Sequence, residues 1–134
     1  ELIDHVTGLT AVELDLDCVA FLREKYADRP HFHLVAADIL EFSFSSLLKA
    51  GPLRVIGNLP YNISSPILFR LHTLAPIMVD AHFMLQQEFA MRCYAKPGTP
   101  NYGRLTVMLA LIFDVYPVLV VKIRLYQDDS NHPV

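Results

Sequence analysis

Short apolar runs that are typical of β-strands alternate with segments of helical periodicity along this 134-residue chain. Such alternation is typical of a sheet of parallel strands with helices on both of its faces. The runs that predict strands are residues 9–14, 32–36, 53–57, 81–86 and 115–121. The segments that predict helices are residues 1–6, 16–26, a turn and short helix within 39–50, and then 67–73, 88–94 and 103–112. The sequence therefore predicts a doubly wound α/β fold.

Cap residues mark where two of these helices begin. Asp15 is placed to cap the helix of residues 16–26, because its side chain can accept hydrogen bonds from the first backbone amides. Ser64 and Ser65 precede Pro66, and proline is tolerated in a first helical turn. These residues predict that the next helix begins just after the proline.

The composition limits the kind of protein. With 53% hydrophobic residues, the chain has enough apolar material for one domain or part of one. Its most apolar stretch, residues 105–121, contains Asp114 and Pro117 and is shorter than the ~20 residues of a membrane-spanning helix. We therefore expect a soluble protein with no membrane partner. The chain begins at Glu1 without an initiator methionine or a signal-like segment, so we expect it to start inside a longer protein.

The charge balance argues against a nucleic-acid surface on these residues. The chain has 11 Lys and Arg residues against 14 Asp and Glu residues, which gives a net charge of −3. A protein that binds nucleic acid is expected to present a basic surface, because it neutralises phosphates. This objection applies to these 134 residues only.

The cysteines and histidines predict neither a disulfide nor a metal site. Cys18 and Cys93 lie far apart in apolar-periodic surroundings, which favours buried thiols and a reducing, cytoplasmic compartment. His31 and His33 flank Phe32 in a predicted strand, where they share one face. No third ligand lies nearby, so exposed or capping histidines are favoured over a metal site.

Three other groups allow a structural and a functional interpretation. Met84, Met91 and Met108 are expected in the core rather than around a cofactor. Residues 86–88 end a predicted strand, where structural hydrogen bonds are favoured over a place in a pocket. Arg104 either contacts a phosphate or caps a carbonyl, and the sequence does not separate these two roles.

The segment Asn58-Leu59-Pro60-Tyr61 follows a predicted strand at its carboxyl end, where α/β sheets bind ligands. The Asn58 side-chain oxygen can accept a hydrogen bond from the exocyclic amine of a nucleobase. Pro60 stiffens the turn and pushes Leu59 into an extended conformation that aims the Leu59 carbonyl outward. Tyr61 can stack on the base, which is worth roughly 1–3 kcal/mol. Group transfer to such an amine and a simple strand–turn–helix connection explain the tetrapeptide equally well.

Acidic residues stand at the ends of the two strands that come earlier. Glu13 lies at the end of one strand and Asp38 follows the next, so both would share the carboxyl edge with Asn58. A carboxylate can accept from both hydroxyls of a ribose, and Asp38 could also accept from the amine of an adenine. A capping role explains either residue alone at least as well. The three positions in series indicate a site for a nucleoside cofactor.

A Rossmann fold also needs a glycine-rich first turn. The five glycines of this chain form no G-x-G pattern. We therefore expect that turn, together with the first strand, to precede Glu1.

Five segments of the chain, in order, carry a resemblance to a known family. They are Val12-Glu13-Leu14-Asp15, Ala37-Asp38, Gly57-Asn58-Leu59-Pro60-Tyr61-Asn62-Ile63-Ser64, His82-Phe83-Met84-Leu85-Gln86 and Tyr102-Gly103-Arg104-Leu105. With these segments the chain resembles the KsgA-type ribosomal RNA adenine dimethyltransferases. The resemblance implies a Rossmann-like class I methyltransferase fold, incomplete at both ends, that uses S-adenosylmethionine.

The resemblance also implies a role for each site residue. Glu13 would bind the cofactor ribose, and Asp38 with Ile39 would bind the cofactor adenine. The target amine would be held by Asn58, which also borders the cofactor, and by the Leu59 carbonyl, with Pro60 stiffening the turn and Tyr61 stacking on the base. Residues 1–121 would form part of the catalytic domain, and residues 122–134, which diverge from the family, a flexible tail.

The implied function is dimethylation of adenine N6 in small-subunit ribosomal RNA during ribosome biogenesis, by a cytoplasmic monomer. One alternative is the related large-subunit adenine methylase family. Another is a chain without catalysis, which is either an inactive fragment or a binding factor in ribosome assembly. Identification of the methylated adenines separates the small-subunit enzyme from the large-subunit methylase. Binding of S-adenosylmethionine separates an enzyme from a non-catalytic protein.

Overall fold

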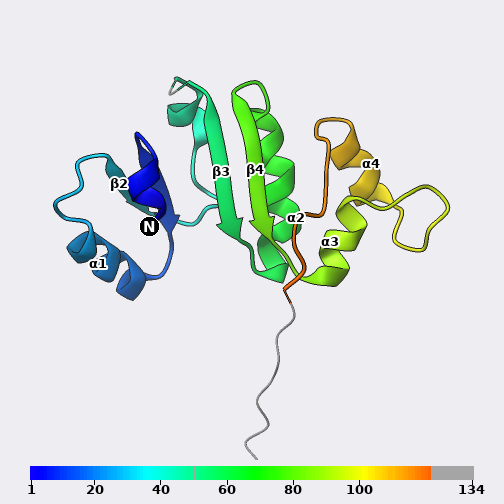
Figure 1. Cartoon of the computed structure of the whole chain (residues 1–134), viewed down its shortest axis with the longest axis horizontal. Coiled ribbons are helices and arrows are strands. Elements are labelled where there is room, and N and C mark those ends of the chain that lie inside the picture. The colour runs from blue at the N-terminus through cyan, green and yellow to red at the C-terminus, as the bar shows by residue number, and fades with distance from the viewer. Residues whose placement is uncertain (50, 122–134) are drawn as a thin grey trace, which may run out of the picture. The chain divides into compact units, whose positions relative to one another are not determined.

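The structure, a computed structural model, describes residues 1–49 and 51–121 as an α/β arrangement (Figure 1). The chain divides into two compact units, Glu1–Leu85 and Gln86–Val134. The first unit contains, with η for a 3-10 helix, η1 (Leu2–His5), β1 (Leu9–Glu13), α1 (Leu16–Lys25), β2 (Phe32–Ala36), η2 (Phe44–Lys49), β3 (Leu53–Asn58), α2 (Tyr61–Arg70), η3 (Leu71–Leu74) and β4 (Met78–Met84). The second unit contains α3 (Gln87–Cys93) and α4 (Arg104–Ala110). The predicted alternation of strands and helices is confirmed for the first unit.

Strands β1 and β2 form a parallel pair that ends with Glu13 opposite Ala36. Helix α1 connects the two strands, and Asp15 caps its N-terminus as predicted. The Asp15 carboxylate accepts hydrogen bonds from Cys18 N and Asp17 N, each at 2.9 Å. These bonds lower the pKa of the Asp15 carboxyl, because they stabilise its ionised form.

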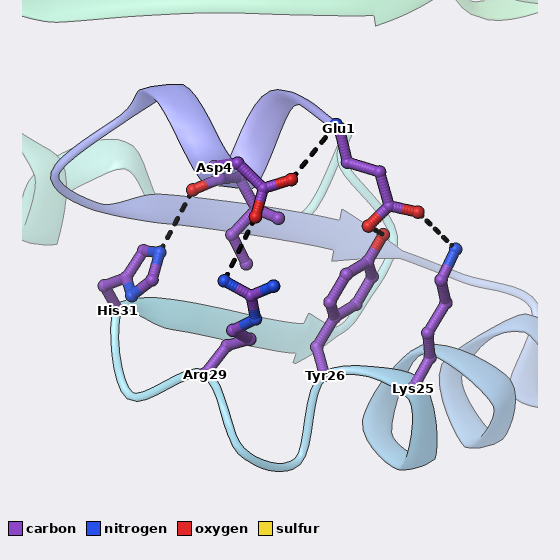
Figure 2. A network of polar contacts seen from close by, with 7 residues as sticks. Glu1, Asp4, Lys25, Tyr26, Arg29 and His31 are labelled. Carbon is purple, nitrogen blue, oxygen red and sulfur yellow. Dashed lines mark hydrogen bonds and ion pairs between the residues drawn. The ribbon is translucent and has the colours of Figure 1, made fainter.

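Helix η1 is fastened to the segment that joins α1 and β2 by a network of polar contacts (Figure 2). Ile3, within η1, is 2% exposed, so apolar burial accompanies the polar contacts. The contacts are an ion pair of Lys25 with Glu1 at 2.8 Å, a hydrogen bond from the Tyr26 hydroxyl to Glu1 at 3.1 Å, an ion pair of Arg29 with Asp4 at 3.0 Å, and a hydrogen bond of His31 Nε2 with the Ile3 carbonyl at 3.1 Å.

Strands β3 and β4 form a second parallel pair that ends with Asn58 opposite Met84. On one face of this pair Arg54 Nη1 lies 3.0 Å from Asp80 Oδ2, an ion pair between neighbouring strands. Helix α2 and the following η3 contribute most of the buried apolar side chains of the first unit, namely Ile67, Leu68, Leu71 and Leu74.

In the second unit, α3 and α4 bury Phe89, Cys93, Leu105 and Leu109. Thr106 is 5% exposed, and its hydroxyl donates to the Arg92 carbonyl at 2.7 Å and accepts from Gly103 N at 3.3 Å. One buried hydroxyl therefore joins the last turn of α3 to the first turn of α4.

Strand pairing differs from the prediction in two respects. Within the described residues, the strands form two two-stranded sheets, β1–β2 and β3–β4, rather than one continuous sheet. The predicted strand 115–121 is wrong, because these residues have no partner strand in the described part of the chain. Their apolar side chains remain open to solvent, with Tyr116 73% and Val118 83% exposed.

Two element boundaries also differ. Helix α2 begins at Tyr61, with Pro60 as its N-cap, so the first proline of this region starts the helix and Pro66 lies within it. Strand β4 begins at Met78, three residues before the predicted start, because Asp80 does not interrupt the strand. The Asp80 carboxylate stays on the sheet surface, where it meets Arg54 of β3.

Burial corrects four predictions about single side chains. Cys93 is buried as expected, but Cys18 is exposed in the first turn of α1. The three methionines predicted for the core are partly exposed, with Met84 at 53%, Met91 at 38% and Met108 at 37%.

The predicted tail, residues 122–134, lies outside the described residues. None of the helices within 1–49 and 51–121 has the length and hydrophobicity that crossing a bilayer requires.

Candidate functional site

Glu13, the last residue of β1, has a carboxylate that is fixed by its own turn. Its Oε1 atom accepts hydrogen bonds from Leu14 N at 2.8 Å and from Asp15 N at 2.9 Å. Two donors on one oxygen orient the carboxylate, and the second oxygen keeps its acceptor capacity. The side chain can therefore accept hydrogen bonds from a ligand at the carboxyl end of β1.

Asp38 follows β2 at the same edge of the β1–β2 pair. The backbone places it there, because Ala37 N donates to the Glu13 carbonyl at 3.0 Å. Asp38 Oδ1 accepts from Leu40 N at 2.8 Å, and its carbonyl accepts from Phe42 N at 2.8 Å. The carboxylate thus starts a tight turn, in which Ile39 is the next residue. Its other oxygen has no hydrogen-bonding partner among residues 1–49 and 51–121.

The Asn58–Tyr61 segment leaves β3 in a constrained path. Leu59 N donates to the Met84 carbonyl at 3.0 Å, so this residue stays bonded to the neighbouring strand. A Cβ atom on Gly57 would lie 3.3 Å from the Leu59 side chain and 3.5 Å from the Phe83 ring. This close approach favours glycine directly before the motif, because a Cβ atom there would require the Leu59 side chain to shift by a few tenths of an ångström.

Three of the four side chains of the motif, those of Asn58, Pro60 and Tyr61, are exposed to solvent, and Leu59 is half-buried. Asn58 is exposed, and it makes no side-chain hydrogen bond to any residue within 1–49 and 51–121. Tyr61 is 58% exposed at the first position of α2. An exposed amide and an exposed aromatic ring therefore lie three residues apart in sequence, at and just after the carboxyl end of a strand, which suits binding of a nucleobase.

The predicted site residues fall into two groups. Glu13, Asp38 and Ile39 share the carboxyl edge of β1–β2, and the Asn58–Tyr61 segment lies at the carboxyl edge of β3–β4. In the described part of the chain, no hydrogen bond or ion pair joins Glu13 or Asp38 to Asn58, Leu59 or Pro60.

The other candidate residues have structural roles or lie on the surface. His31 bonds to Ile3, His33 is exposed, and the described residues contain no cluster of three or more potential metal ligands. Residues 86–88 are exposed, as is Arg104 at the start of α4.

Sequence reasoning missed two residues that organise these segments. Arg70, in the last turn of α2, donates to the Ile39 and Phe42 carbonyls. Ser64 was interpreted as a helix start, yet it is 1% exposed inside α2, and its hydroxyl donates to the Pro60 carbonyl. Its position four residues after Pro60 was the available signal, because serine in a helix can bond to that carbonyl.

Comparison with known proteins agrees with these motifs. The family model described as ribosomal RNA adenine dimethylase matches residues 1–131. Three similar curated proteins each carry the name ribosomal RNA small subunit methyltransferase A. They come from Marinobacter nauticus (46% identical, over 84% of this chain and 41% of the relative), Nitrosomonas eutropha (45% identical, 90% and 45%) and Cupriavidus metallidurans (47% identical, 90% and 43%).

The chain thus spans less than half the length of the curated relatives that it matches. The family model nevertheless covers both groups of site residues. The chain therefore belongs to the ribosomal RNA adenine dimethylase family, as its motifs predicted.

Proposed function

We propose that the protein containing this chain transfers methyl groups to N6 of adenines in small-subunit ribosomal RNA, as a step in ribosome biogenesis. Family membership supports the reaction type. The names of the three relatives favour the small subunit over the large-subunit alternative. The chain spans under half the length of these relatives, so the activity is proposed for the longer protein, acting as a cytoplasmic monomer.

The two parallel strand pairs support a Rossmann-like class I methyltransferase fold. β1 and β3 each have one edge that pairs with no described strand. In the doubly wound order the first strand of the fold lies at the centre of the sheet, and here that strand is the one expected before Glu1 rather than β1. A further parallel strand from the longer protein would pair with these two edges and make one sheet of the two pairs.

The cofactor proposed for the β1–β2 edge is S-adenosylmethionine. Its ribose has two neighbouring hydroxyls, and Glu13 offers a carboxylate that its own backbone already orients. Asp38 has one oxygen bonded to Leu40 N, which leaves the other for the amine of the cofactor adenine. Ile39 would supply an apolar contact beside that adenine. This donor set fits a nucleoside with a diol and an exocyclic amine.

The target adenine is proposed to bind at the Asn58–Tyr61 segment. The observation that carries this proposal is the exposed Asn58 amide, which has no hydrogen-bonding partner among the described residues. Its oxygen and the Leu59 carbonyl would accept from the two N6 hydrogens of adenine. Tyr61 would stack on the base, and Pro60 would keep the turn between these groups stiff.

In the proposed reaction, these residues would orient the target amine and stabilise the charge that develops on it. S-adenosylmethionine, when bound, would supply a methyl group on a sulfonium, which can pass to N6 and leave a neutral thioether, with the displaced N6 proton released to water. Asn58 and Leu59 would align the N6 lone pair, and such positioning can supply up to ~7–11 kcal/mol of barrier reduction. Their oxygens would also stabilise the positive charge that develops on N6. After one transfer the amine still carries one hydrogen, so a second cycle is possible.

Mapping of modified adenines tests the function. The protein, extended to the length of its relatives, is incubated with S-adenosylmethionine and unmethylated small or large ribosomal subunits, and the digested RNA is analysed by mass spectrometry. We expect dimethyladenosine in small-subunit RNA alone. Modification of large-subunit RNA instead would support the alternative family. If neither RNA is modified and calorimetry detects no cofactor binding, the protein is non-catalytic, either an inactive chain or a binding factor in ribosome assembly.

A further inference from the structure

Ser64 is a buried hydroxyl within the helix that follows the Asn58–Tyr61 segment. It is 1% exposed, although the segment before it is largely open to solvent. Its Oγ atom donates to the Pro60 carbonyl at 2.8 Å and lies 3.5 Å from the Leu59 carbonyl oxygen. Among the described residues, the acceptors that this buried hydroxyl approaches are therefore the two carbonyls of the motif.

The two carbonyls differ in how far they are already satisfied. The Pro60 carbonyl accepts from Ile63 N at 3.2 Å, from Ser64 N at 3.1 Å and from Ser64 Oγ. Within residues 1–49 and 51–121, the Leu59 carbonyl has only a long approach from Ser64, at 3.5 Å, beyond the ~2.5–3.0 Å of a well-formed O–H···O bond. Its lone pairs therefore keep capacity for another donor.

We propose that Ser64 is a positioning residue that orients the Leu59 carbonyl toward the target amine, an inference that rests on the proposed function. A hydroxyl has one hydrogen to donate, and here it is directed to the Pro60 carbonyl. That bond holds the peptide group between Pro60 and Tyr61 in place, because its carbonyl is bonded to the Ser64 side chain of α2. Because Leu59 N is held by Met84 and proline fixes its own φ, the Leu59 carbonyl between these points is left with one orientation.

Ser65 provides the matched control. It follows directly in the same helix, and it makes no side-chain hydrogen bond to the described residues. Ser64→Ala should still fold, because the Pro60 carbonyl retains its two backbone donors. Ser64→Thr retains the hydroxyl, and threonine in a helix also bonds to the carbonyl four residues earlier.

The test measures methyl transfer by the full-length protein to unmethylated small subunits, with cofactor affinity measured by calorimetry and folding by thermal unfolding. For Ser64→Ala we expect kcat to fall about tenfold, which corresponds to one weakened hydrogen bond in the transition state. We expect KM for the subunit and the Kd of S-adenosylmethionine to stay within about twofold. Ser65→Ala should match the wild type, and Ser64→Thr should recover most of the lost kcat.

The outcomes separate this inference from the function on which it rests. If the wild-type protein makes no dimethyladenosine, the proposed function and the inference both fail. If the wild type is active and Ser64→Ala has an unchanged kcat, the inference alone fails. Should Ser64→Ala unfold, the pair Ser64→Thr and Ser64→Val decides, because they share one shape and differ in the hydroxyl. Equal kcat in that pair would overturn the positioning role.

Discussion

Arg70 Nη1, in the last turn of α2, donates to the Ile39 carbonyl at 3.1 Å. The second nitrogen of the same guanidinium, Nη2, donates to the Phe42 carbonyl at 2.6 Å. One side chain therefore fastens the helix that begins at Tyr61 to the turn that begins at Asp38. In the proposed site, Arg70 connects the segment that holds the target base to the turn that holds the cofactor adenine.

Replacement of Arg70 by lysine should loosen this connection. Lysine keeps the charge, but it lacks the planar fork that reaches two carbonyls at once. We expect the free energy of unfolding to fall by about 1.5–3 kcal/mol for the charged hydrogen bond that is lost. Chemical denaturation of Arg70→Lys measures this, with Arg23→Lys at an exposed position of α1 as the control. Equal losses in the two variants would contradict the role of Arg70.

Removal of Glu13 should weaken cofactor binding. Loss of a charged acceptor costs about 1.5–3 kcal/mol, which corresponds to a Kd for S-adenosylmethionine that is about 10- to 150-fold higher. Calorimetry on Glu13→Ala in the full-length protein measures this change. Glu13→Gln separates ligand binding from turn structure, because it retains an acceptor for Leu14 N and Asp15 N. The control is Glu24→Ala, and an unchanged Kd for Glu13→Ala would count against the assignment.

Much of the site was predictable because its signals are local. Asp15 caps α1 through atoms two and three residues away, and Glu13 and Asn58 end their strands where the apolar runs end. The order of apolar runs, acidic residues and the proline motif therefore defined both groups of site residues. Each of these features depends on neighbours in the sequence.

The errors concern features that depend on distant parts of the chain. Residues 115–121 have the composition of a strand, but a strand also needs a partner, and the described residues provide none. Composition likewise gave no sign that Met84 would lie on an exposed strand face. Helix α2 was placed too late because Pro60 and Pro66 both suit a helix start, and the sequence alone did not choose between them.

Thr106→Val should destabilise the second unit. The substitution keeps the shape of the side chain but removes a buried hydroxyl, so the Arg92 carbonyl and Gly103 N lose a partner. We expect the free energy of unfolding to fall by about 1–3 kcal/mol. Thr99 donates to the Lys96 carbonyl at 2.7 Å in an exposed loop, so Thr99→Val is a control expected to stay within about 0.5 kcal/mol. Equal effects would show that burial of Thr106 does not matter.

The two thiols should differ in reactivity. Burial raises the pKa of Cys93 to about 11, so about one Cys93 in a thousand is a thiolate at pH 8. The Asp15 carboxylate raises the pKa of Cys18 as well, but this thiol is exposed. We expect an alkylating reagent to modify Cys18 in the native protein and Cys93 only after unfolding, with both rates rising as the pH rises above 8.

Single-cysteine variants check this prediction by mass spectrometry. Cys93→Ala leaves the exposed thiol, and Cys18→Ser leaves the buried one. If the native Cys18→Ser variant reacts as fast as Cys93→Ala, the packing between α3 and α4 described above is wrong.

The central claim is that Asn58 holds the target amine. The decisive measurement is methyl transfer to unmethylated small subunits by Asn58→Ala in the full-length protein, beside the Kd of S-adenosylmethionine. Asn101→Ala, in the loop before α4, is the control for loss of a surface amide. We expect Asn58→Ala to lower kcat by at least about 100-fold, as does removal of one hydrogen-bonding group that acts on developing charge, while the Kd stays within about threefold. Wild-type methylation by Asn58→Ala would contradict the account.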